Sequence, residues 1–197
     1  MLIDTIIRSF IAVEVDDATV QMAIQRLQSK ISTVNADIKL VSLENLHVTL
    51  RFLGKIPISS TVQICDALQH VQFTQFHVEL RGVGCFPRLD RIRVLWIGMK
   101  HGITELTDLY NEIQRQLHRC GIAPDRRCFR PHITIGRVRS RKNMDRLAQI
   151  VTCLAQATIG MQTVTAIKLK KSELTPKGPV YTSLCEIPAI TENQRGR

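Results

Sequence analysis

Two short motifs of the form His-x-Thr are the first chemical signal in this chain. His47 and Thr49 lie within Leu-His-Val-Thr-Leu, and His132 and Thr134 lie within Pro-His-Ile-Thr-Ile. On a β-strand, side chains two residues apart point to the same face, so each imidazole and its hydroxyl project together. The intervening aliphatic residues then pack behind them. The sequence therefore predicts two polar patches, each with one histidine and one threonine.

Two such patches that face each other have the chemistry needed to cleave a phosphodiester bond. Cleavage needs a base that activates the nucleophile and an acid that protonates the leaving oxygen. Histidine serves both purposes near neutral pH because its unperturbed pKa is about 6.5. Threonine hydroxyls donate to the non-bridging phosphate oxygens, whose charge changes in the transition state. Because the motifs are nearly symmetric, these physical arguments leave the acid and the base unassigned.

Other uses of these residues fit the sequence less well. Neither motif has an Asp, Glu or Cys at ligand spacing, so we expect no metal ion and no other cofactor. Gly-x-Ser-x-Gly is absent, and Gly82-Val83-Gly84 is too short for a phosphate loop, so a serine hydrolase and a nucleoside triphosphate site are not expected. The histidines outside the motifs are expected at the surface or in interfaces, namely His70, His77, His101 and His118.

The net charge of +10 and the pI of about 9.7 point to an acidic partner. Nucleic acid is the natural polyanion, an acidic membrane surface comes second, and a solvated basic face is the plain alternative. No apolar run approaches the ~20 residues of a membrane span. Basic residues crowd near the second motif, with a smaller group before it: Arg126, Arg127, Arg130, Arg137, Arg139, Arg141 and Lys142, then Arg88, Arg91 and Arg93. Their concentration beside a candidate active site favours nucleic acid.

The elements that must position the motifs alternate as β-α-β-α-β-β and then α-β-α-β-β. Alternating apolar residues predict strands at 6–15, 46–53, 76–80, 93–99, 132–138, 163–174 and 180–187. Apolar residues at helical spacing predict helices at 20–31, 59–71, 103–119 and 143–157. Gly82, Gly84 and Pro87 are expected to break the third strand, and Pro176-Lys177-Gly178-Pro179 marks a turn.

Each half of the chain places its motif strand after one helix and before another, which indicates a degenerate internal repeat. We therefore predict an α+β fold of two pseudo-symmetric lobes. Each lobe is a mainly antiparallel sheet with helices on its outside, and the lobes face each other across a central cleft. The predicted domain covers 1–190, followed by a polar tail at 191–197. The strand order is not predicted.

The apolar N-terminal stretch carries Asp4 and Arg8 and lacks a basic start and a small-residue cleavage site. It predicts a strand rather than a signal peptide, and a cytoplasmic protein. The cysteines show neither Cys-x-x-Cys nor zinc-ligand spacing, so we expect small apolar residues in a reduced compartment. Disulfides of an unusually oxidised thermophile are the alternative. The six cysteines are Cys65, Cys85, Cys120, Cys128, Cys153 and Cys185.

Taken in order, the two motifs and several further segments resemble the two-histidine (2H) phosphoesterases. The branch with the most similar pattern is the RNA 2′,3′-cyclic phosphodiesterases, also called LigT-type proteins or 2′-5′ RNA ligases. Besides the two motifs, the resemblance includes the segments 8–12, 84–87, 93–98, 172–174 and 178–181. Either motif alone would be a weak signal, whereas the whole set in this order is highly specific.

This resemblance implies hydrolysis of a 2′,3′-cyclic phosphate at an RNA end to a 2′-phosphomonoester, without a metal ion. It implies His47 as proton donor to the departing 3′ oxygen and His132 as the acceptor that activates water. Thr49 and Thr134 would hold the phosphate oxygens. Some members also join RNA ends through a 2′-5′ bond without ATP. The implied partner is RNA with a cyclic phosphate end, with no membrane, and we expect a monomer.

Three arginines are candidate substrate ligands. Arg137 matches the family's basic residue after the second motif, but strand parity places Gly136 on the face of His132. A bulge or strand end at Gly136 would correct this. Arg51 shares parity with His47, although an ordinary strand-end arginine explains it equally well. Arg130 is the third candidate.

Three alternatives stay open at this stage. They are 2′-5′ RNA ligation, hydrolysis of another cyclic or 2′-5′-linked nucleotide, and a non-catalytic RNA-binding module. Single-stranded RNA ends are usually recognised by stacking on aromatic rings. The aromatic candidates near the family-like segments are Phe10, Phe52, Phe86 and Tyr181.

Overall fold

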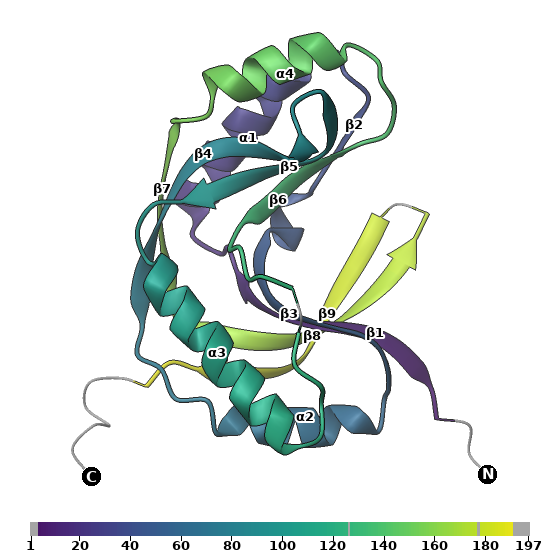
Figure 1. The fold of residues 1–197 in the computed structure, drawn as a ribbon, viewed down its shortest axis with the longest axis vertical. Helices are drawn as coiled ribbons and strands as arrows, with labels where there is room; N and C mark the ends of the chain where they lie inside the picture. Colours follow the sequence, from purple (N-terminus) through teal and green to yellow (C-terminus); the bar gives the residue numbers. More distant parts are fainter. Residues whose placement is uncertain (1–3, 126, 177, 191–197) are drawn as a thin grey trace.

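A curled sheet forms the centre of the computed structural model, which describes residues 4–125, 127–176 and 178–190 (Figure 1). Its nine described strands follow the order β7-β4-β5-β6-β3-β1-β8-β9, with β2 paired to β6 beside this path. Paired strands run antiparallel. The strands are β1 Ile6–Glu14, β2 Ile38–Leu40, β3 His47–Pro57, β4 Phe76–Arg88, β5 Arg91–Met99, β6 Ile133–Val138, β7 Thr158–Val164, β8 Ala166–Thr175 and β9 Gly178–Pro188.

The sheet divides into two lobes at the junction of β3 and β6. These strands pair through Val48 and Ile133, the residues between histidine and threonine in the two motifs. The first-motif lobe contains β3, β1, β8 and β9, and the second-motif lobe contains β6, β2, β5, β4 and β7. The predicted α+β fold with one motif in each lobe is confirmed.

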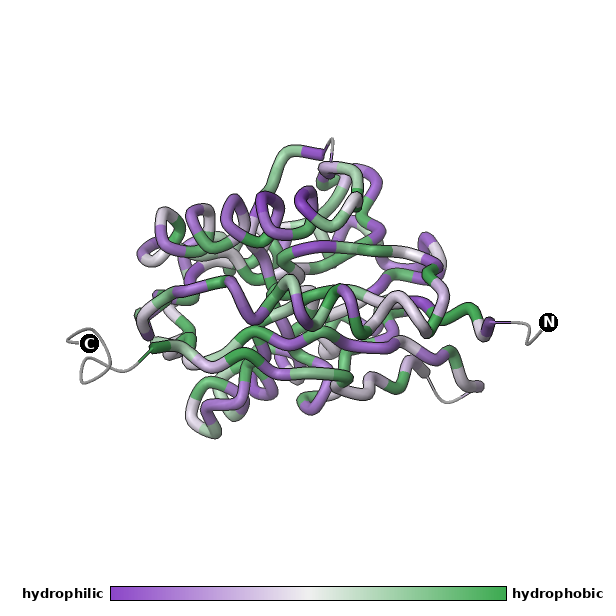
Figure 2. The backbone as a smooth tube through the Cα atoms, turned by 90° about the horizontal axis from the view of Figure 1, so that it is seen from below, coloured by the Kyte–Doolittle hydropathy of each residue, from purple (hydrophilic) through white to green (hydrophobic). Residues whose placement is uncertain are grey.

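Four described α-helices cover the outside of the two lobes (Figure 1). They are α1 Ala18–Ser32, α2 Ser60–Gln69, α3 Ile103–Arg119 and α4 Met144–Cys153, and a short 3₁₀ turn, η1, spans Leu43–Asn45. The predicted helix at 103–119 is confirmed at both ends, because its apolar stripe is buried: Leu106, Leu109, Ile113 and Leu117. In Figure 2, hydrophobic and hydrophilic positions alternate along helices and strands, as expected where each element buries one face.

The lobes are not consecutive halves of the chain. Helix α1 precedes the first motif but contacts α4 and β7 in the second-motif lobe. Helix α3 precedes the second motif but contacts α2 and β3 in the first-motif lobe. Helices α2 and α4, which follow the motifs, each stay in the lobe of their own motif. The two halves of the chain therefore exchange their first helices.

Three strand predictions differ from the structure. β4 continues through the expected break because Gly82, with φ of 75°, accommodates a register shift between Arg81 and Val83. The predicted strand at 163–174 is two strands, β7 and β8, which turn at Thr165 and belong to different lobes. β2 is too short to give a periodic signal, and its pairing with β6 was not predicted.

The expectation of six reduced cysteines is wrong for one pair. Cys65 on α2 and Cys185 on β9 form a disulfide with their Cα atoms 6.2 Å apart. They are 120 residues apart in sequence, so no local spacing indicated the pair. Cys85, Cys120 and Cys128 are among the free cysteines.

Some predictions fall outside the described residues. They concern Arg126 in the basic cluster, Lys177 in the predicted turn and the tail at 191–197. Within the described residues, no helix is both long enough and apolar enough to span a membrane.

Candidate active site

The two motifs meet where β3 and β6 lie side by side. Val48 and Ile133 are paired and buried, so they occupy the core face of the sheet. The antiparallel direction then brings His47 beside Thr134, and Thr49 beside His132, on the opposite face. The structure thus brings the four predicted catalytic side chains into one pseudo-twofold cluster.

Both histidines are held by the same backbone interaction. The Nδ1 atom of His47 lies 2.7 Å from the carbonyl oxygen of Asn45, and Nδ1 of His132 lies 2.7 Å from that of Arg130. Because a carbonyl only accepts hydrogen bonds, each Nδ1 carries the hydrogen. Nε2 is therefore the atom that gains or loses a proton in both rings. Arg130 is placed at the site, and the contact it makes with His132 is through its main chain.

Aromatic rings enclose His47. The ring centroids of Phe10 and Tyr181 lie 4.9 and 5.3 Å from that of His47. This burial lowers the pKa of His47 from 6.5 to about 4. The hydrogen bond to Asn45 and the charge of Glu14 oppose the shift, and the charges of Lys170 and His132 add to it. Without substrate, His47 is neutral at pH 7.

An ion-pair cluster lies beside His47. Glu14 is the β1 residue paired with His47, and its carboxylate binds the Nζ atoms of Lys168 and Lys170 from β8. Lys170 is only 5% exposed, and Lys168 also lies 3.2 Å from Glu186. The ion pairs with these lysines hold the pKa of Glu14 below its usual value even though burial opposes this. The sequence analysis did not predict this cluster. The signal that could have indicated it is Lys168 and Lys170, which alternate with apolar residues on one strand.

His132 has aromatic neighbours of its own. The centroid of Phe86 lies 5.2 Å from the His132 ring, and that of Trp96 lies 6.4 Å from it. The indole of Trp96 covers Gly84, where any Cβ would overlap the ring. This is why a glycine is required on β4 at this point. Of the four predicted stacking residues, Phe10, Tyr181 and Phe86 therefore border the histidines of the two motifs.

A register shift places Arg137 on the face of the sheet that carries the motif side chains. β5 and β6 pair Trp96 with Thr134, but Leu95 with Gly136, so Ile135 is the extra residue. Ile135 and Gly136 are both buried, and Arg137 is exposed opposite Val94, on the face of Thr134. The irregularity predicted near Gly136 is confirmed one residue earlier.

Arg51 turns away from this face because β3 has its own register shift at Leu50. Its guanidinium is buried, 2.5 Å from the carbonyl oxygen of Ala123 and 3.0 Å from the carboxylate of Asp125. Asp125 also binds Arg127, which lies over the Phe52 ring at 5.4 Å. The parity argument for Arg51 is therefore wrong. Arg51 anchors the segment that leads from α3 to His132.

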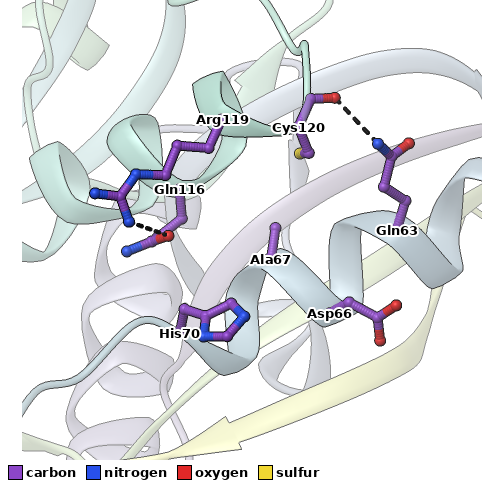
Figure 3. A pocket seen from close by; sticks show the side chains of 7 residues that line it. All are labelled: Gln63, Asp66, Ala67, His70, Gln116, Arg119 and Cys120. Carbon is purple, nitrogen blue, oxygen red and sulfur yellow. Dashed lines mark hydrogen bonds between the residues drawn. The ribbon is translucent and has the colours of Figure 1, made fainter.

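An open hollow lies away from the motifs. It is an open groove of about 580 Å³ between α2 and α3 (Figure 3). Gln63 bridges it by a hydrogen bond to the Cys120 carbonyl, and Arg119 binds the amide oxygen of Gln116. In the described part of the chain, no group of three or more His, Cys, Asp or Glu side chains is placed to hold a metal ion.

Two facing His-x-Thr strands at the junction of two α+β lobes define a two-histidine phosphoesterase. The model of the family described as LigT-like phosphoesterases matches residues 14–96 and 97–181. The chain belongs to this family, and the two matched segments correspond to the repeat predicted from the sequence.

Relatives and solved structures agree with this assignment. An RNA 2′,3′-cyclic phosphodiesterase of Archaeoglobus fulgidus is 39% identical over 90% of this chain and 97% of that protein. The one from Aeropyrum pernix is 36% identical over 86% of this chain and 96% of that protein. Apo E. coli LigT is 25% identical with a TM-score of 0.75, covering 94% of this chain and 99% of that one. A Thermus thermophilus protein is 26% identical, also with a TM-score of 0.75, and the match covers 94% of this chain and 99% of that one.

Proposed function

We propose that the protein hydrolyses the 2′,3′-cyclic phosphate at an RNA end to a 2′-phosphomonoester. The pairing of Val48 with Ile133 carries this proposal, because it brings two imidazoles and two hydroxyls together on one face. Curated relatives that match most of the chain bear the name of this activity. An acid, a base and hydrogen-bond donors for the phosphate are all supplied by side chains, so the mechanism needs no metal ion.

In the proposed reaction, the Nε2 atom of His132 removes a proton from water. The water oxygen attacks phosphorus, and the bond between phosphorus and the 3′ oxygen breaks. The Nε2–H of His47 protonates that oxygen, which leaves a 3′-hydroxyl and a 2′-phosphate. Thr49 and Thr134 donate to the non-bridging oxygens of the reacting phosphate. Arg137, which is exposed on the same face, adds positive charge for the RNA strand.

The donor role of His47 requires help from the substrate. A pKa of about 4 leaves the free imidazole unprotonated at pH 7. A phosphodiester anion placed against the ring favours the imidazolium form and raises this pKa. We therefore propose that His47 becomes an acid only when the phosphate is bound. If the anion fails to raise the pKa, the two histidines exchange roles and His132 becomes the donor.

The test is turnover of a short RNA that ends in a 2′,3′-cyclic phosphate, in the presence of EDTA. The products are resolved by mass and by the position of the phosphate. We expect the gain of one water and a 2′-phosphate with the wild type, and loss of this product with His47→Ala and His132→Ala. His70→Ala, at an exposed histidine in the α2–α3 groove, is the matched control and keeps wild-type activity.

Two results would contradict the proposal. A 3′-phosphate product would mean that the 2′ oxygen is the leaving group. No turnover by the wild type would contradict the proposed activity. A single domain over 1–190, a monomeric state and a cytoplasmic location stay predictions.

A further inference from the structure

An arginine outside the predicted site projects from the catalytic face of the first-motif lobe. Arg8 on β1 pairs with Ser172 on β8, which pairs with Tyr181 on β9, so these three side chains form one row across the sheet. Phe10, two residues along β1, shares this face, and its ring centroid lies 5.0 Å from that of Tyr181. Because Tyr181 also contacts His47, the row containing Arg8 lies next to the catalytic histidine.

Arg137 approaches the same place from the second-motif lobe. Burial raises the pKa of Tyr181, while the charges of Arg137 and Arg8 both oppose this rise. Both guanidinium groups are therefore close enough to the Tyr181 hydroxyl to act on its charge. Two arginines from opposite lobes converge on one tyrosine, beside the cluster of histidines and threonines.

The two converging charges are not neutralised by the protein. Arg8 and Arg137 are exposed, and neither forms an ion pair with a carboxylate in the described ranges. The lysines of the neighbouring strand β8 differ, since each of them is paired with a glutamate: Lys168, Lys170 and Lys171. Two guanidinium groups that converge without a carboxylate repel each other, and an anion between them would relieve this repulsion.

We propose that Arg8, Arg137 and the Tyr181 hydroxyl form a second phosphate subsite, for the internucleotide phosphate that precedes the cyclic phosphate. The inference rests on the proposed function and extends it to the class of substrate. The rings of Phe10 and Tyr181 lie between this subsite and His47. The reacting phosphate binds to the side chains of the two motifs. A chain of at least two nucleotides fills both subsites, whereas a cyclic mononucleotide fills one.

The test compares two substrates that differ by one nucleotide and one phosphate. They are cytidine 2′,3′-cyclic phosphate and the dinucleotide cytidylyl-cytidine with a 2′,3′-cyclic phosphate end. We expect Arg8→Met to lower kcat/KM for the dinucleotide by tens of fold more than for the mononucleotide, because a charge-assisted contact is lost with the dinucleotide. Arg26→Met, at an exposed charge on α1, is the matched control and leaves both values unchanged.

Equal losses on both substrates, or no loss on either, would overturn the subsite. A binding measurement separates this outcome from failure of the proposed function. In a His132→Ala background, the affinity for the dinucleotide is measured against salt concentration with and without Arg8→Met. We expect the slope of log affinity against log salt to become about 0.7 shallower, the change for one lost contact to a single strand. An unchanged slope would reject the subsite whether or not the wild type turns over RNA.

Discussion

The two histidines make the same backbone hydrogen bond but lie in different surroundings. His47 is enclosed by Phe10 and Tyr181 and lies beside the paired charges of Glu14 and Lys170. His132 lies against Phe86 at the end of an arginine-rich segment, on the lobe that contributes Arg137. The fold therefore repeats the geometry of the reacting nitrogen and varies the electrostatics around it. Two copies of one motif thus have different surroundings, and at His47 burial lowers the pKa to about 4.

The comparison is tested most strongly by a substrate that needs no acid. The nitrophenolate group of bis(4-nitrophenyl) phosphate leaves as a stable anion. With a cyclic phosphate end, His47→Ala and His132→Ala are each expected to lose about 10²–10⁴-fold in kcat. With bis(4-nitrophenyl) phosphate, we expect the kcat of His47→Ala to return close to the wild-type value, whereas the kcat of His132→Ala stays low. If steady-state assays instead show that His132→Ala regains activity with the activated ester, His132 is the acid and His47 is the base.

Burial of His47 also predicts an acid-sensitive fold. Its pKa is about 4 in the folded protein, against the ordinary histidine value of 6.5, so the unfolded chain binds the proton more tightly. The folded state is unaffected above pH 6.5 and loses stability as the pH falls toward 4, by about 3 kcal/mol from this group. In urea unfolding at pH 7 and pH 4, His47→Gln should lose less stability between the two pH values than the wild type. Gln25→Ala, at an exposed helical position, should match the wild type.

The two threonines should be equivalent, unlike the two histidines. Each hydroxyl lies beside the histidine of the other motif, so one phosphate between the lobes meets both hydroxyls in the same way. Thr49→Val and Thr134→Val are each expected to lower kcat on the order of 10²-fold, as the loss of one oxyanion donor does. Single-turnover rates measure this directly. If only one of the two substitutions lowers the rate strongly, the phosphate is bound by the threonine of that lobe alone.

The charges beside His47 should shift its titration in opposite directions. Removing the positive charge with Lys170→Met raises the pKa of His47, and removing the negative charge with Glu14→Gln lowers it. The pH dependence of kcat/KM reports the free enzyme, so it shows both shifts. The double variant, which removes the pair together, should lie between the two. If both variants shift the pKa of His47 in the same direction, Glu14 and Lys170 form a structural ion pair that does not tune this histidine.

The parts of the site that depend on local pattern were predictable. The two motifs, their strands and the buried stripe of α3 follow from residue spacing alone, and the structure contains each of them. Strand parity raised a specific objection to Arg137, and the register shift at Ile135 is the feature that answers it. For Arg51, the same parity argument is wrong because of a shift at Leu50 that the sequence does not signal.

The missed features depend on pairing between distant segments. The Cys65–Cys185 disulfide joins residues 120 positions apart, and Glu14 meets Lys170 only because β1 and β8 are neighbours in the sheet. Register shifts also arise from how two strands fit each other, not from the residues of one strand. A single sequence therefore shows which residues could react but not which charges surround them.

The exchange of helices between lobes bears on how such a chain could have arisen. A polypeptide with one copy of the repeat would hold the motif strand and its following helix, but its first helix and its last two strands would have no lobe of their own to join. Two identical subunits could supply that helix to each other, as α1 and α3 do within this chain. The present chain is thus equivalent to a fused homodimer with swapped helices. Severing the chain between the repeats should yield fragments that fold together rather than separately.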